Sequence, residues 1–137
     1  MGKRKETDIG RLELAQLMLG DARFNLRHRR YRCAISRSYY ACHHAARWCL
    51  DAVGQALQKS RSGAHRACIN QFSLHLIKTQ NLPASLSTTL QDLLGFRETA
   101  DYELKFIGVE AAAQLSCEQA EAFLNEVLKW QNAPAMN

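Results

Sequence analysis

The stretch YRCAISRSYYACHHAARWCLDAVGQA, residues 31–56, decides the fold of this chain. One set of its residues is small or apolar and recurs at intervals of three and four, as on one face of a helix. The set is Ala34, Ile35, Ser38, Ala41, Cys42, Ala45, Cys49 and Ala52. Side chains this small allow another helix to pack closely. We therefore expect a long helix from about Tyr31 to Ala56.

The opposite face of the same helix carries polar chemistry. Arg37, Tyr40, His44, Arg47 and Asp51 also recur at intervals of three and four, so they form one stripe. Two guanidiniums, a phenol and an imidazole suit a phosphate-rich ligand. The simpler alternative is that the tyrosine and the histidine are half-buried and satisfied by neighbouring helices.

Helical spacing continues on both sides of this stretch. Thr7 or Asp8 can cap a first helix, and a third helix follows the polar residues 58–63. Ser85 or Ser87 can begin a fourth helix. The last helix is expected to begin at Ser116, because residues 116–119 (SCEQ) fit a capping box, with residues 108–115 as a connector.

These elements predict an all-α fold, an up-and-down bundle of four long helices plus a shorter fifth, since no stretch alternates with a period of two. We expect one domain over residues 7–131, a disordered basic tail over residues 1–6 and a frayed end over residues 132–137. A chain of 137 residues is long enough to bury a core of this kind.

Composition narrows the class of protein further. No apolar run approaches the roughly 18 residues of a membrane span, and the first residues carry charges with no apolar core behind them. We therefore expect a cytoplasmic protein that does not enter a membrane. Five cysteines, odd in number and without close pairing, predict buried free thiols. Histidines and carboxylates lack ligand spacing as well, so neither a metal nor another cofactor is expected.

Positive charge is concentrated in the first two thirds of the chain. Residues 1–91 hold 15 basic and 5 acidic side chains, whereas residues 92–137 hold 3 basic and 8 acidic ones. Between Ala22 and Leu50 there are seven arginines and no acidic residue. Such a cluster favours RNA or a nucleotide as ligand, and Arg29, Arg30 and Arg32 join the candidate binding residues.

A second polar group occupies residues 97–102. Arg97 and Asp101 stand four apart and can pair on a helix surface, which is the simpler interpretation. If this segment faces the stripe, the two form one cleft, which His65 could join from the start of the third helix. Within it Arg37, Arg97 and Asp101 are candidate catalytic residues together with His44, whose imidazole could move a proton while the guanidiniums stabilise a phosphate. The candidate binding residues are Tyr40, Arg47, His65 and Tyr102, beside the three arginines named above.

Four blocks of sequence follow one another along the chain: residues 36–47 (SRSYYACHHAAR), His65, residues 74–83 (LHLIKTQNLP) and residues 97–102 (RETADY). In order and spacing they resemble the small stand-alone HEPN-domain proteins, over about residues 11–128. The resemblance implies a helical bundle that usually dimerises and is commonly encoded beside a minimal nucleotidyltransferase, as a toxin–antitoxin pair. Trp48 and Trp130, more than a small bundle needs inside, also favour a homodimer.

The resemblance also implies an activity. Active members of the superfamily are metal-independent ribonucleases with an arginine, four to six further residues and then a histidine. By position that arginine is Arg97, but Asp101 and Tyr102 stand where the histidine is expected, and no histidine follows His75. In related toxins a tyrosine near this motif is modified with AMP by the partner nucleotidyltransferase, which makes Tyr102 a candidate here. The alternative is that Tyr102 packs its ring in the core.

Two functions follow. The first is a toxin-type protein that binds RNA and cleaves it without a metal, with His44 or His65 as the proton-transfer group. The second is a non-catalytic helical partner that holds nucleotide or substrate for a separate nucleotidyltransferase. The stripe favours the first, and the missing histidine after Arg97 favours the second.

Overall fold

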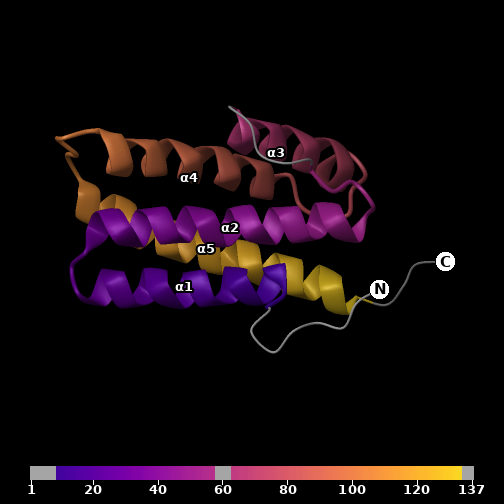
Figure 1. The fold of residues 1–137 in the computed structure, drawn as a ribbon, viewed down its shortest axis with the longest axis horizontal. Coiled ribbons are helices and arrows are strands. Elements are labelled where there is room, and N and C mark those ends of the chain that lie inside the picture. Colours follow the sequence, from indigo (N-terminus) through magenta and orange to yellow (C-terminus); the bar gives the residue numbers. More distant parts are fainter. Residues whose placement is uncertain (1–8, 58–62, 134–137) are drawn as a thin grey trace.

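The computed structural model describes residues 9–57 and 63–133. In chain order its elements are α1 (Arg11–Arg27), α2 (Tyr31–Ala52), α3 (Ala64–Phe72), the π-helical turn η1 (Ser73–Ile77), α4 (Ser85–Tyr102) and α5 (Val109–Asn132). The four long helices run up and down beside one another, and α3 lies against one end of the bundle (Figure 1). No strand occurs in the described ranges, so the predicted all-α class is confirmed.

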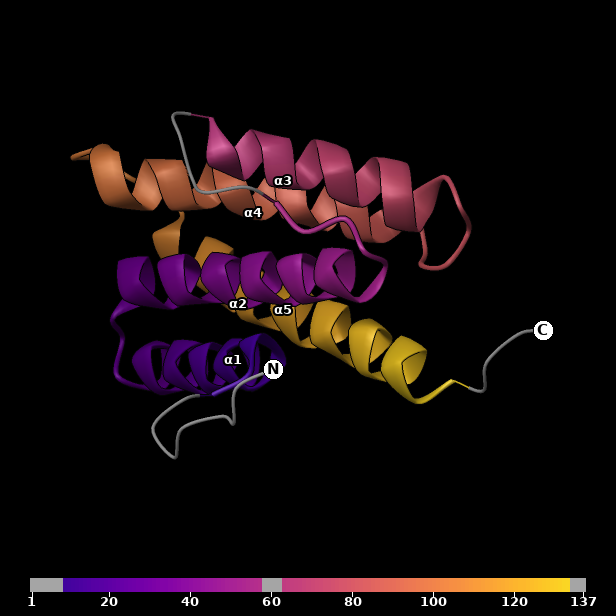
Figure 2. The ribbon, with the colours of Figure 1, turned by 45° about the vertical axis from the view of Figure 1, so that its right-hand side comes forward.

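The helix predicted first from the sequence is the centre of the molecule. Helix α2 packs against α1 on one side, against α3 and α4 on the other, and against α5 behind it (Figures 1 and 2). Its small face is buried as expected from Ala34 to Cys49, whereas Ala52, the last residue of the predicted face, is exposed at the end of the helix. Because these side chains are short, three long helices can approach one axis closely. Several polar side chains of α2, among them Arg32 and Tyr40, therefore contact a neighbouring helix.

Two predicted helix boundaries are wrong. Helix α2 ends at Ala52 rather than Ala56, because the chain turns at Gly54, whose φ is +76°. Helix α5 begins at Val109, seven residues before the predicted capping box, after Gly108 with a φ of +77°. Ser116 is then a fully buried mid-helix residue. The cap predicted at Thr7 or Asp8 lies outside the described residues, and α1 begins at Arg11.

The thiols and the tryptophans are largely internal. Four of the five cysteines are buried and free, while Cys33 is exposed, against expectation. Burial raises the pKa of the Cys68 thiol to about 11. Trp48 and Trp130 pack edge to face with ring centroids 6.1 Å apart. Each of the two rings is partly buried, so their packing on one another leaves the homodimer a prediction.

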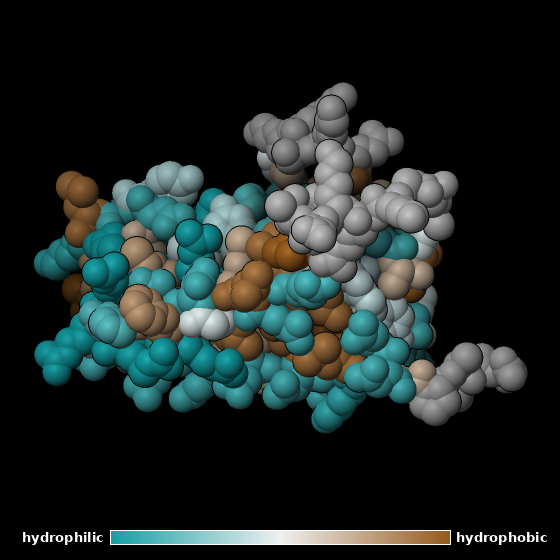
Figure 3. Space-filling view, turned by 60° about the horizontal axis from the view of Figure 1, so that its bottom comes forward, coloured by the Kyte–Doolittle hydropathy of each residue, from teal (hydrophilic) through white to brown (hydrophobic). Residues whose placement is uncertain are grey.

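The outer surface carries apolar side chains among polar ones. Viewed from the side of α1, the molecule is mainly hydrophilic, with a hydrophobic area near the middle (Figure 3). Leu17 and Phe24, two turns apart on α1, are 58% and 47% exposed. None of the described helices combines the length and the apolar character that a bilayer span requires.

Candidate functional site

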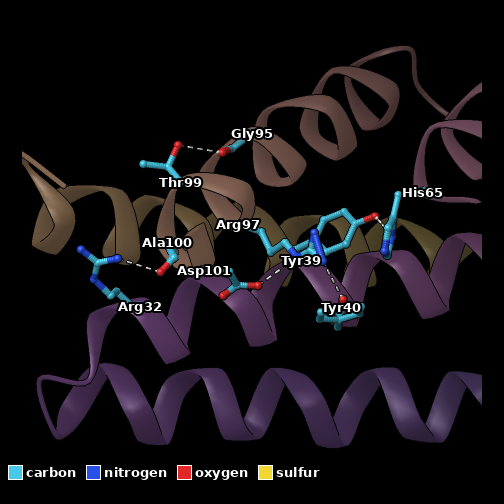
Figure 4. A network of polar contacts seen from close by, with 9 residues as sticks. All are labelled: Arg32, Tyr39, Tyr40, His65, Gly95, Arg97, Thr99, Ala100 and Asp101. Atoms are coloured by element: carbon cyan, nitrogen blue, oxygen red, sulfur yellow. Dashed lines mark hydrogen bonds and ion pairs between the residues drawn. The ribbon is translucent and has the colours of Figure 1, made fainter. Parts of the chain in front are cut away.

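Arg97 is the centre of a polar network between α2 and α4. The side chain is only 11% exposed, although it sits on a helix at the edge of the bundle. Its Nε lies 3.1 Å from the Oδ2 of Asp101, one turn further along α4. Its Nη2 donates a hydrogen bond of 3.0 Å to the hydroxyl of Tyr40 on α2 (Figure 4). The predicted ion pair therefore forms within α4, with a buried arginine and a more accessible aspartate, and the hydrogen bond to Tyr40 joins α4 to α2.

Aromatic rings enclose the same guanidinium. Its central carbon lies 5.9, 5.5 and 5.7 Å from the ring centroids of Tyr39, Tyr40 and Tyr102. Attraction between a cation and the faces of aromatic rings offsets part of the cost of removing Arg97 from water. Tyr102 is 72% exposed and covers the cation from the solvent side. The alternative that Tyr102 packs in the core is therefore wrong.

A pocket of about 330 Å³ opens beside this network. It is lined by Arg32, Cys33, Ser36, Arg37, Tyr40 and Asp101. Four residues that the sequence singled out are therefore brought together from two helices: Arg32, Arg37, Tyr40 and Asp101. Because Arg97 donates to the Tyr40 oxygen, the hydroxyl proton of Tyr40 is free to donate to a ligand. The pocket thus offers guanidinium and hydroxyl donors, with one carboxylate at its wall.

His65 reaches the network from the first turn of α3. Its Nδ1 shares a 2.7 Å hydrogen bond with the hydroxyl of Tyr39, whose ring is fully buried (Figure 4). Its ring centroid lies 5.8 Å from that of Tyr40 and 5.0 Å from that of His43. Burial, reinforced by the positive charge of Arg97, holds the pKa of His65 below its usual value. The ring is therefore neutral at pH 7.

His44 takes part in a different cluster, on the edge of α2 that faces α1. Its Nδ1 accepts a 3.3 Å hydrogen bond from Nη1 of Arg11, since arginine can only donate. The same guanidinium lies 3.6 Å from the Asp51 carboxylate, Nε to Oδ2. Burial, together with the charges of Arg11 and Arg47, lowers the pKa of His44 to about 4. The predicted stripe is thus divided, with Arg37 and Tyr40 at the pocket and His44, Arg47 and Asp51 beyond it.

The three arginines at the start of α2 have different environments. Arg32 donates to the carbonyl oxygens of Ala100, Glu103 and Leu104, at 2.8, 2.6 and 3.0 Å. A cation at the carboxyl end of α4 satisfies carbonyls that no helical turn can satisfy. Arg29 and Arg30 are exposed in the turn between α1 and α2 and line a second pocket with Val109. Arg32 thus has a structural role that the sequence did not indicate.

Three residues of the two clusters escaped the sequence analysis. Tyr39 and His43 stand four apart, so their shared face was visible in the sequence, but Tyr39 belongs neither to the stripe nor to the small face. Arg11 reaches its cluster only through the packing of α1 on α2, which no local pattern indicates. Across the described parts of the chain, no His, Cys, Asp or Glu side chains converge in threes to hold a metal ion.

Comparison with known proteins gives one result. The family model described as HEPN domain matches residues 11–131, which is most of the chain. No curated protein shows a significant match to this chain. All three network residues on α2 and α4, Tyr40, Arg97 and Asp101, fall inside the matched range.

Proposed function

Because the chain belongs to the HEPN family, a class of helical domains associated with RNA cleavage or nucleotide binding, we propose that it binds RNA at the pocket beside Arg97 and cleaves it without a metal. The observation that carries the proposal is the convergence of Arg37 and Tyr40 from α2 with Asp101 from α4 at one pocket. Arg97 contacts two of the residues that line this pocket, Tyr40 and Asp101. Cationic and hydroxyl donors at one concave site suit a phosphodiester.

His65 is the residue we assign to proton transfer. In the tautomer whose Nδ1 donates to Tyr39, Nε2 is unprotonated and can take the proton of a ribose 2′-hydroxyl. The 2′-oxygen then attacks the adjacent phosphorus, the bond to the 5′-oxygen breaks, and the 5′-oxygen takes a proton from water. The products are a 2′,3′-cyclic phosphate and a 5′-hydroxyl, and His65 returns its proton to the solvent. Positive charge from Arg37 and Arg97 stabilises the phosphorane that forms in between. His44 is less suited to this role, because its Nδ1 is occupied by Arg11 and its Nε2 carries the proton.

The biological setting that fits this proposal is a toxin-type protein regulated by a cognate minimal nucleotidyltransferase antitoxin. Support comes from the resemblance of the sequence blocks to stand-alone members and from the exposure of Tyr102. An AMP group on its hydroxyl would add negative charge beside Arg97, 5.7 Å from the ring, and would repel an RNA backbone. Co-expression with the nucleotidyltransferase, followed by intact mass measurement, tests this. We expect a gain of one AMP unit that Tyr102→Phe abolishes, and a gain that survives the substitution contradicts it.

A homodimer belongs to the same proposal. It is supported by the resemblance and by Trp48 and Trp130, which contact each other and remain partly exposed. Sedimentation equilibrium at micromolar concentration is expected to give twice the mass of the chain. A monomer under these conditions contradicts the proposal.

One observation favours a second function, that of a non-catalytic nucleotide-binding partner. Arg97 already contacts Asp101 and Tyr40, so little of the guanidinium is available to a scissile phosphate. In that case RNA or AMP would bind at the pocket and remain intact.

Binding to the pocket is tested by fluorescence anisotropy with a labelled oligoribonucleotide. Arg37→Gln removes an exposed positive charge at the pocket, so the affinity is expected to fall roughly tenfold. Arg23→Gln is the matched control, because Arg23 pairs with Glu121 at 2.9 Å between α1 and α5 and does not line this pocket. Equal affinities of Arg37→Gln and the wild type would exclude the pocket as the RNA site.

A further inference from the structure

The cluster around His44 has the features of an anion site that the pocket does not use. Arg11 from α1 donates to the imidazole of His44, and Arg47 follows His44 by three residues on α2, which places it on the same side of that helix. The imidazole proton lies on Nε2, so this ring is a hydrogen-bond donor to a ligand. Within the described residues Arg47 takes part in no ion pair, whereas Arg11 is held by the carboxylate of Asp51. The side chains of Arg11 and Asp51 are 32% and 47% exposed, so a ligand in solvent can reach them.

This cluster continues the line of the pocket along α2. Arg37 borders the pocket and His44 follows it by seven residues, close to two helical turns, so both lie on nearly the same side of the helix. Seven residues correspond to roughly 10 Å along the axis. A single phosphate group is too small to contact both positions. A backbone with several phosphates can contact both at once.

From this arrangement we infer that Arg11, His44 and Arg47 form a second phosphate subsite, which makes the ligand an oligoribonucleotide lying along α2 rather than a mononucleotide. The inference rests on the proposed RNA binding and adds the length and direction of the ligand. Asp51 competes with the phosphate for Arg11. His44 contributes an Nε2–H donor here and takes no part in proton transfer.

The test compares a dinucleotide with an octanucleotide of the same RNA sequence, by anisotropy over a range of salt concentrations. Wild-type protein is expected to bind the octanucleotide more tightly. Arg47→Gln should weaken octanucleotide binding roughly tenfold and lower the salt slope by about 0.7, which is the contribution of one contact to a single-strand phosphate. It should leave dinucleotide binding unchanged.

Asp51→Asn is expected to increase affinity, and a misfolded variant would not bind more tightly. Removing the competing carboxylate frees Arg11, so octanucleotide affinity should rise severalfold while dinucleotide affinity stays constant. Arg23→Gln, which also breaks an ion pair on α1, should change neither affinity. If both oligonucleotides bind equally, and Arg47→Gln and Asp51→Asn bind them as the wild type does, the subsite is excluded. RNA binding at the pocket is then unaffected by this result. If neither oligonucleotide binds, the proposed function itself fails and the subsite falls with it.

Discussion

At the scale of single residues, the site depends on polar groups kept neutral or paired inside a helical bundle. His43 is buried among Tyr39, His44 and His65, and burial is the main reason that its pKa falls to about 3. Arg97 is a largely buried cation, and its guanidinium is surrounded by the carboxylate of Asp101 and three aromatic rings. A neutral imidazole beside a retained cation is the arrangement that general-base chemistry at a phosphate requires.

The histidines predict how stability depends on pH. The pKa of His43 is near 6.5 in the unfolded chain and about 3 in the folded one, so the unfolded state binds more protons between these values. The contribution of His43 to the free energy of unfolding should be complete above about pH 6.5. Below that pH it should fall by at most about 1.4 kcal/mol per pH unit. Urea unfolding at pH 7, 6 and 5 measures the slope. His43→Gln should flatten it, and an unchanged slope in this variant contradicts the assignment.

At the scale of elements, Arg32 connects the start of α2 to the end of α4. Arg32→Leu removes three charge-assisted hydrogen bonds to carbonyls and should cost about 1–2 kcal/mol of unfolding free energy. Arg37→Leu, on the same helix but exposed, should change stability by less than about 0.5 kcal/mol. Urea denaturation of the two variants is the measurement. Equal stabilities would mean that Arg32 does not anchor α4.

The glycine before α5 supplies a second comparison between elements. Gly108 has a φ of +77°, and a Cβ added to it would meet open space. Gly108→Ala should therefore lower the free energy of unfolding by about 1 kcal/mol, because only the strained backbone conformation opposes it. Gly95 lies in the middle of α4 with equally open space, and Gly95→Ala should stabilise by about 0.5–1 kcal/mol. Thermal unfolding should therefore shift the two variants in opposite directions. If both variants shift the unfolding temperature in the same direction, Gly108 does not have the left-handed conformation that begins α5 here.

The bounds of a helix could be predicted from the sequence where one face of the helix is uniformly apolar. They could not be predicted where contacts with other helices determine the structure. The start of α2 at Tyr31 and of α4 at Ser85 follow from periodicity and from the preceding turns. The start of α5 could not be predicted in this way. Residues 116–119 have the sequence of a capping box, but Ser116 packs against the core in the middle of the helix. The burial of Arg97 was also not predictable, since an arginine is normally exposed and two of the three rings around it come from another helix, α2.

At the scale of the whole molecule, the bundle places two basic positions along one helix. α2 contributes Arg37 and Tyr40 to the pocket and His44 to the second cluster, while α4 and α1 contribute the partners Asp101 and Arg11. The guanidinium groups of Arg97 and Arg11, which each contact α2 from a neighbouring helix, are also paired with carboxylates, those of Asp101 and Asp51. Asp101→Asn should therefore raise RNA affinity severalfold by removing negative charge from the pocket, as measured by anisotropy. A fall in affinity, with the fold intact by circular dichroism, would contradict the placement of RNA at this pocket.

The most direct test of metal-free RNA cleavage at this site is single-turnover cleavage of end-labelled RNA in excess EDTA, with analysis of the product ends. The wild-type protein should cleave and leave 2′,3′-cyclic phosphates. His65→Gln should lose at least about a hundredfold in rate, within the range that general acid–base catalysis contributes. His44→Gln should cleave a dinucleotide at the wild-type rate. No cleavage by the wild type in EDTA, or cleavage that His65→Gln leaves unchanged, would contradict the account.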